Sequence, residues 1–147
     1  MTQQRQDKDT RFDELIAVIN ATPADRLEHT IGERPGGVDE ALDLVFDKMA
    51  SLFNAAKAKS GKGVFQHEIT SSDGTKRPYY LQVRDGACTS GRGSLDGAEV
   101  TLGMKLVDML HIATGKLSGH KAFLTGRVKI RGNPFFGMKL GEWFDPM

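Results

Sequence analysis

A run of thirty residues near the end of the chain, positions 115–144, constrains the fold more than any other segment. Over residues 127–131 apolar and basic side chains alternate, which is typical of a strand with one face in the core and the other in water. Asn133 then precedes Pro134, so an N-cap residue stands before a proline at the first helical position and a helix should begin there. The apolar residues of that helix form an unusually wide stripe, made of Phe135, Phe136, Met138, Leu140, Trp143 and Phe144.

The same run resembles the ending of the sterol carrier protein, or lipid-transfer, family. That ending combines a Gly-Lys-Leu turn, an alanine-phenylalanine helix, a Gly-x-x-x-Ile-x-Gly strand and a methionine-leucine helix. The matching segments here are Gly115-Lys116-Leu117, Ala122-Phe123, Gly126 to Gly132 and Met138-Lys139-Leu140. The resemblance implies an α+β fold, in which a five-stranded, mainly antiparallel sheet is covered by helices and encloses a hydrophobic lipid-binding tunnel.

The length of 147 residues suits one domain with a real core. We expect an N-terminal extension over residues 1–37 that is partly helical, and a sterol-carrier-like lipid-binding domain over residues 38–147. The first ten residues are polar without periodicity, which predicts a frayed terminus. Helical periodicity then predicts two short helices in the extension and, in the domain, one helix of roughly twenty residues that stops at Gly61.

The sequence pattern in the middle of the chain predicts a β-sheet. Alternation and turn residues predict a hairpin over residues 65–83, a third strand after Asp85-Gly86 and a fourth strand from Val100. Because the connections are short, we expect these strands to form an antiparallel meander. Another helix should follow and end near Gly115, and the strand at residues 127–131 completes the sheet.

The apolar residues exceed what short helices usually need, and the resemblance gives them a function. Without it they would be interpreted as core. Family members enclose a tunnel that receives sterols, fatty acids, fatty acyl-CoA or phospholipids, and burial of a chain at about 0.8 kcal/mol per methylene requires few polar contacts. We expect the C-terminal helix to close the tunnel. The residues expected to bind the ligand are Phe65, His67, Ile69, Leu81, Val83, Leu102, Leu106, Met109, Leu110, Phe123, Leu124, Phe136, Met138, Leu140, Trp143 and Phe144.

No group of residues predicts catalysis. Cys88 and the four histidines show no triad or metal-ligand spacing, so we expect no enzyme activity, no metal and no cofactor. His67 is unusual because it lies on an apolar strand face between Phe65 and Ile69. A hydrogen-bonded core histidine is the first interpretation, and if the residue lines a cavity it would anchor a sterol hydroxyl or a fatty carboxylate.

Charge and composition limit the partners. Twenty Lys and Arg against nineteen Asp and Glu give a net charge of +1, which argues against a nucleic-acid binder. From Lys116 onward basic residues predominate, which indicates a solvated strand face or, as the sharper interpretation, a weak contact with an anionic membrane surface. The single cysteine, with no span-length apolar stretch and no apolar signal region, predicts a soluble, cytoplasmic protein.

Three functions are compatible with these patterns. The favoured one is a non-enzymatic carrier, monomeric or homodimeric, of a fatty acid, fatty acyl-CoA, sterol or similar lipid. The second is a small enzyme or biosynthetic accessory protein that holds a hydrophobic intermediate in the same cavity for a partner enzyme. The third is a structural dimerisation module with a solid interior. The sequence names neither the natural ligand nor the role of residues 1–37.

Overall fold

One five-stranded sheet organises the protein, in a computed structural model that describes residues 2–147. The strands follow the order β3-β2-β1-β4-β5, and every neighbouring pair is antiparallel except β1 and β4, which are parallel. The expected five-stranded, mainly antiparallel sheet is therefore confirmed. Its strands are β1 (Gly63–Thr70), β2 (Lys76–Arg84), β3 (Ala87–Arg92), β4 (Val100–Lys105) and β5 (Lys129–Gly132).

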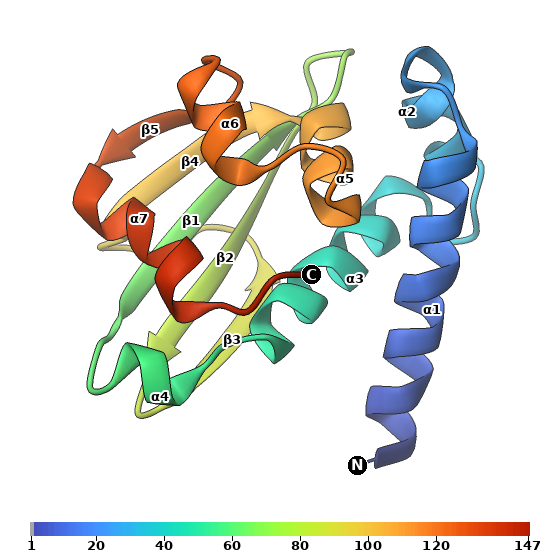
Figure 1. Ribbon diagram of the computed structural model, residues 1–147. Helices are drawn as coiled ribbons and strands as arrows, with labels where there is room; N and C mark the ends of the chain where they lie inside the picture. Colours follow the sequence, from blue (N-terminus) through green and yellow to red (C-terminus); the bar gives the residue numbers. More distant parts are fainter. Residues whose placement is uncertain (1) are drawn as a thin grey trace.

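The helices lie on one side of this sheet (Figure 1). Helices α3, α5 and α7 contact the strands, whereas α1 and α2 pack on the outer side of α3 and α5. As a result, α1 is the long element furthest from the sheet (Figure 1). The helices are α1 (Thr2–Ala21), α2 (Ala24–Gly32), α3 (Gly37–Ser51), α4 (Ala55–Ala58), α5 (Leu106–Thr114), α6 (Gly119–Leu124) and α7 (Pro134–Trp143).

The parallel pairing of β1 and β4 shows that the prediction of a fully antiparallel meander was wrong. Strands β1 to β3 form an antiparallel meander, but β4 returns to the far side of β1, where Leu102 lies beside His67 in parallel register. The connecting loop is fixed by Gln66, a buried residue on the face opposite the helices. Its amide donates to the Gly93 carbonyl at 2.9 Å, and its side-chain oxygen accepts from the Leu95 N–H at 3.0 Å. A short connection therefore crosses the sheet because a buried glutamine satisfies its backbone groups.

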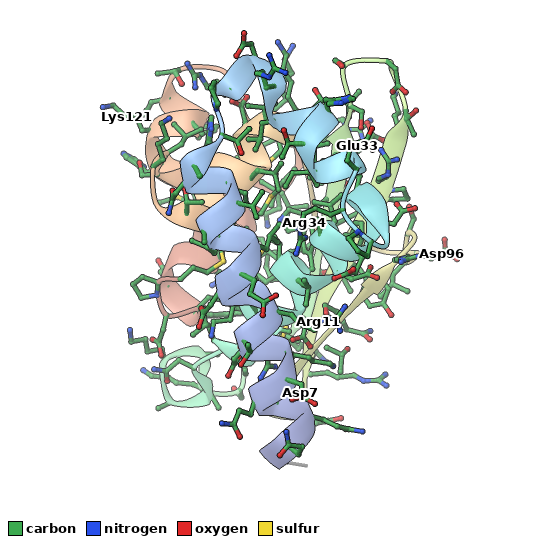
Figure 2. The ribbon with its side chains drawn as sticks, turned by 90° about the vertical axis from the view of Figure 1, so that its right-hand side faces the viewer. Asp7, Arg11, Glu33, Arg34, Asp96 and Lys121 are labelled. Atoms are coloured by element: carbon green, nitrogen blue, oxygen red, sulfur yellow. The ribbon has the colours of Figure 1, made fainter. Side chains whose placement is uncertain are left out.

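The prediction of a frayed terminus was also wrong for the described residues, because residues 2–10 form the first half of α1. The Nη2 group of the Arg5 guanidinium donates a hydrogen bond to Asp47 of α3 at 2.8 Å. One turn and a half further on, Arg11 pairs with Glu40 at 2.7 Å. Figure 2 shows α1 running along the molecule with Asp7 and Arg11 on it. Helix α1 also buries the apolar side chains Phe12, Leu15 and Ile19.

The single helix expected to end at Gly61 is broken in the structure, and α3 and α4 take its place. At the break, the chain hydrogen-bonds the end of α7. The Asn54 N–H donates to the Trp143 carbonyl at 2.7 Å, and the Asp145 N–H donates to the Leu52 carbonyl at 2.9 Å. The break therefore provides the attachment point for the C-terminal segment.

The C-terminal strand and helix form as their local signals predict. Lys129 and Arg131 of β5 are exposed, while Ile130 between them is half-buried on the helix-facing side. The Asn133 side chain accepts hydrogen bonds from the first free N–H groups of α7 at 3.0 and 3.2 Å, and the helix begins at Pro134 as expected.

Candidate functional site

A cavity of about 390 Å³ lies between the helix-facing side of the sheet and the helices α6 and α7. Its volume is in the range of about 300–1,000 Å³ that is usual for small-molecule sites. Apart from two histidines, the lining side chains are apolar. The lining residues are Met49, His67, Leu102, Met104, Met109, Ile112, Gly119, His120, Phe123, Val128, Ile130, Pro134, Gly137, Met138, Leu140 and Gly141.

The structure divides the predicted ligand-binding residues into three groups. Those that line the cavity are His67, Leu102, Met109, Phe123, Met138 and Leu140. Those that are buried in the core and do not line it are Phe65, Ile69, Leu81, Val83, Leu106, Leu110, Phe136, Trp143 and Phe144. Leu124 belongs to neither group, because it is 67% exposed. Contact of the lining residues with a ligand stays a prediction.

Several lining residues were missed, although some had a usable signal. Met104 lies two positions after Leu102 on β4, so strand alternation would have placed both on the same face. The lining glycines Gly119, Gly137 and Gly141 left no signal, since a glycine contributes space rather than a side chain.

Methionine is the commonest residue type in the lining. Four of the six methionines of the chain border the cavity. They come from three helices and one strand, so they surround the space rather than cluster on one wall. Because the unbranched thioether side chain is flexible, such a lining can repack around ligands of different shape.

Helix α7 is held to the sheet by the aromatic side chains on its non-cavity side. The Phe136 ring stacks on Phe65 with centroids 4.5 Å apart, and the Trp143 ring meets the Phe65 ring edge-on at 6.0 Å. Two glycines make room for these rings. A Cβ at Gly63 would overlap Phe136, and a Cβ at Gly61 would overlap Trp143. The rings therefore lie directly on backbone, which fixes the height of α7 above the sheet.

The mouth of the cavity lies between α6 and α7. Phe123 of α6 is 47% exposed and Met138 of α7 is 66% exposed, yet both line the cavity. Side chains that border the cavity and also reach solvent mark its opening. Leu124 and Phe135, which are 67% and 77% exposed, extend the apolar surface beyond the two helices.

His67 is the buried polar group of the cavity. Its side chain is 1% exposed, its ring meets the edge of Phe46 at 4.9 Å, and its Nδ1 has no hydrogen-bond partner. The hydrogen-bonded core histidine expected from sequence is therefore wrong for this nitrogen. A buried polar atom without a partner typically costs about 1–3 kcal/mol. Burial lowers the pKa of His67 to about 4, against a weaker opposing effect of the Phe65 carbonyl, so the ring is neutral near pH 7.

A second hollow of about 360 Å³ lies between α1, α3 and β3, and most of its lining residues are polar or charged. Its charged groups satisfy one another. Arg92 donates two hydrogen bonds to Asp43, at 2.6 and 2.9 Å, and the Tyr79 hydroxyl donates to the same carboxylate at 2.8 Å. Burial and the neighbouring Asp43 hold the pKa of Tyr79 above its usual value. On the α1 side, Lys8 and Arg11 pair with Asp47 and Glu40 of α3, so we interpret this hollow as an ion-paired seam between the two helices.

Within residues 2–147, no three His, Cys, Asp or Glu side chains gather into a group that could hold a metal ion. Over the same residues, no helix combines the length and the apolar character needed to cross a bilayer. Burial raises the pKa of the Cys88 thiol to about 12, so the free cysteine has little thiolate character.

Residues 45–145 match the SCP-2 sterol transfer family, about two thirds of the chain. Hydroxysteroid dehydrogenase-like protein 2 of Bos taurus is 30% identical over 114 residues, which are 78% of this chain and 26% of that protein. The chain thus spans about a quarter of the length of that relative. Non-specific lipid-transfer protein-like 1 of Caenorhabditis elegans is 26% identical over 106 residues, which are 71% of this chain and 90% of that protein.

The solved structures agree on the fold. The solution structure of palmitated SCP2L2 from Aedes aegypti superposes with a TM-score of 0.59 at 21% identity, covering 67% of this chain and 88% of that one. The architecture expected from the resemblance is therefore the one observed.

Proposed function

The chain belongs to the SCP-2 sterol transfer family, and from that premise we propose that it binds a hydrophobic lipid in the cavity and carries it through water. The observation that carries this proposal is the lining, which is apolar around a volume of about 390 Å³ except for two histidines. The ligand classes are a fatty acid, a fatty acyl-CoA, a sterol or a similar lipid. Each methylene moved from water into such a lining contributes about 0.8 kcal/mol. The relative named as a lipid-transfer protein and the palmitated neighbour support this assignment.

We propose that α7 closes the cavity and that lipid passes between α7 and α6. Helix α7 is attached by its aromatic side chains and by the hydrogen bonds of its C-terminal end. Helix α6 is shorter, and Ala122 is its buried residue. Passage therefore requires α6 and the cavity side of α7 to separate, while the aromatic cluster stays in place.

We further propose that the mouth faces an anionic membrane surface during exchange. The apolar side chains at the mouth, Phe123, Leu124, Phe135 and Met138, are exposed. Lys121 projects into solvent from α6 (Figure 2), the helix that also carries Phe123 and Leu124. Aromatic and aliphatic residues flanked by lysine favour the headgroup region, where each lysine near anionic lipid contributes about 1 kcal/mol. A reduced thiol suits the cytoplasm, which is where we place this exchange.

Native mass spectrometry of the protein, purified under non-denaturing conditions from the cells that make it, tests the proposal. We expect a population heavier than the chain by the mass of one lipid, which organic extraction then releases for identification. A protein that carries nothing, and that also fails to bind a fluorescent fatty acid, would contradict the carrier function. That result would favour a dimerisation module with a filled interior.

A second candidate is a holder that presents a bound intermediate to an enzyme. It is favoured by two relatives whose names describe enzymes, because the region shared with this chain is 26% of the length of one and 17% of the length of the other. Vesicle-to-vesicle transfer of a fluorescent lipid separates the two. A carrier accelerates the transfer over the spontaneous rate, whereas a holder loads from donor vesicles and does not deliver to acceptors.

A further inference from the structure

The cavity has one polar group at its buried end. His67 lies in the middle of β1, paired with Leu102 on one side and Tyr79 on the other, so the sheet surrounds its backbone. Its ring lines the cavity, is 1% exposed, and leaves Nδ1 without a hydrogen-bond partner. The second lining histidine, His120, is exposed on α6 near the mouth. The two histidines therefore differ, because His67 is buried with a nitrogen that lacks a hydrogen-bond partner, whereas His120 is exposed to solvent.

The charge of the lining restricts what can reach His67. All lining residues belong to the part of the chain that the structure describes, and none of them is Lys or Arg. A carboxylate or phosphate placed against His67 would therefore lose its hydration with no cation to replace it, which is strongly unfavourable. An anionic lipid would keep its head at the mouth and turn its tail toward the histidine. That orientation leaves Nδ1 unsatisfied.

We propose that His67 selects for a neutral lipid whose hydroxyl enters first, so that this cavity prefers a long-chain alcohol to the carboxylate of the same chain length. A hydroxyl can donate a hydrogen bond, so it pairs with the neutral imidazole tautomer in which Nδ1 carries no proton and acts as an acceptor. It satisfies the buried nitrogen without bringing charge into the cavity. This inference rests on the proposed lipid-binding function and adds the chemical class of the head group.

Three ligands of equal chain length test it: 1-hexadecanol, its methyl ether and palmitate. Each competes with an uncharged fluorescent alkyl probe at neutral pH on the full chain. We expect hexadecanol to bind about tenfold more tightly than the ether, because the ether cannot donate a hydrogen bond. In His67→Phe the two should bind equally, and palmitate should bind as it does to the wild type.

Tyr79→Phe is the matched control. Tyr79 faces His67 across the β1–β2 pair and is buried, but its hydroxyl bonds Asp43 outside the cavity. This variant should keep the tenfold preference. A preference of the same size in the wild type and in His67→Phe would overturn the inference, as would a wild-type preference for palmitate. If none of the three ligands displaces the probe or binds, the proposed function fails as well.

A wild-type measurement covers the case in which His67→Phe does not fold. Nitrogen chemical shifts of the His67 ring should change when hexadecanol is added and stay unchanged with the ether. Ring shifts that respond equally to both ligands, or to neither while both bind, would overturn the assignment of the hydroxyl to His67.

Discussion

Replacing Gly141 with alanine should slow lipid exchange and leave lipid affinity unchanged. Gly141 is an exposed position of α7, and a Cβ built there meets nothing within 4 Å. The neighbouring Gly137 is different, since its Cβ would lie 3.4 Å from the Val100 side chain. A methyl group at Gly137 would therefore touch the sheet, whereas a methyl group at Gly141 would change the stability of the helix without a new contact. Alanine in a helix interior is more favourable than glycine by about 1 kcal/mol.

This difference in helix stability changes the rate of lipid exchange if α7 must unwind locally, on the segment that borders the cavity, for lipid to pass. A helix that is about 1 kcal/mol more stable has an open population about fivefold smaller. The same opening precedes both uptake and release. Both rate constants should therefore fall about fivefold, and their ratio, the Kd, should not change.

Stopped-flow fluorescence with a labelled fatty acid measures both rates, and urea unfolding measures the stability gain. Gly32→Ala is the control, because Gly32 ends α2, does not line the cavity and also has nothing within 4 Å of its Cβ. A Gly141→Ala protein that is more stable but exchanges lipid at the wild-type rate would refute the unwinding of α7. Slowing in Gly119→Ala alone would place the moving element in α6.

Three further predictions concern stability and membrane contact. Gly61→Ala should cost about 1–3 kcal/mol of unfolding free energy because its methyl overlaps Trp143, and an unchanged urea midpoint followed by the fluorescence of this single tryptophan would contradict the packing. Because burial lowers the pKa of His67 to about 4 from 6.5, the unfolded chain takes up this proton first. The contribution of neutral His67 to the free energy of unfolding is thus complete above about pH 6.5, and up to about 3 kcal/mol of it is lost as the pH falls toward 4. Urea unfolding measured across this range should therefore show a weaker dependence of the unfolding free energy on pH for His67→Gln than for the wild type. Phe135→Ser should weaken co-sedimentation with anionic vesicles by about tenfold without changing the lipid Kd, since Phe135 is 77% exposed and does not line the cavity; equal sedimentation would remove α7 from the membrane contact.

The parts of the fold that could be predicted are those whose signals are local. The start of α7 follows from Asn133 and Pro134 alone, because the cap and the proline act within three residues. The exposed and half-buried positions of β5 follow from alternation, which also needs no distant partner. Local signals of this kind are independent of the tertiary structure around them.

The predictions that failed concern elements whose interaction partners lie far away in the sequence. Arg5 finds Asp47 across 42 positions, so a polar terminus that looks unstructured forms a helix against α3. Gln66 bonds the loop before β4 from the opposite face of the sheet, which no local spacing reveals. The break between α3 and α4 exists because the chain there hydrogen-bonds the segment after α7.

The sequence predicts which face of the sheet carries the site, but it does not predict where that face leaves a cavity. Alternation identifies the helix-facing side of each strand, and both Phe65 and His67 lie on it. Whether a residue on that face meets a side chain or a void depends on the helix above it. Phe136 fills the space over Phe65, whereas Gly137, one residue later, has no side chain to fill the space beside it.

The two sides of α7 explain why a void persists in a protein of this size. Its aromatic side uses Gly61 and Gly63 to bring large rings onto the backbone, which fixes the helix at one height. Its other side carries glycines and Met138, which are too small or too flexible to fill the space that this height leaves. A module with a solid interior would gain stability from larger side chains here, since unfilled apolar volume costs about 24 cal/mol per Å³. The lining glycines of α7, Gly137 and Gly141, are therefore better explained by an occupant than by packing.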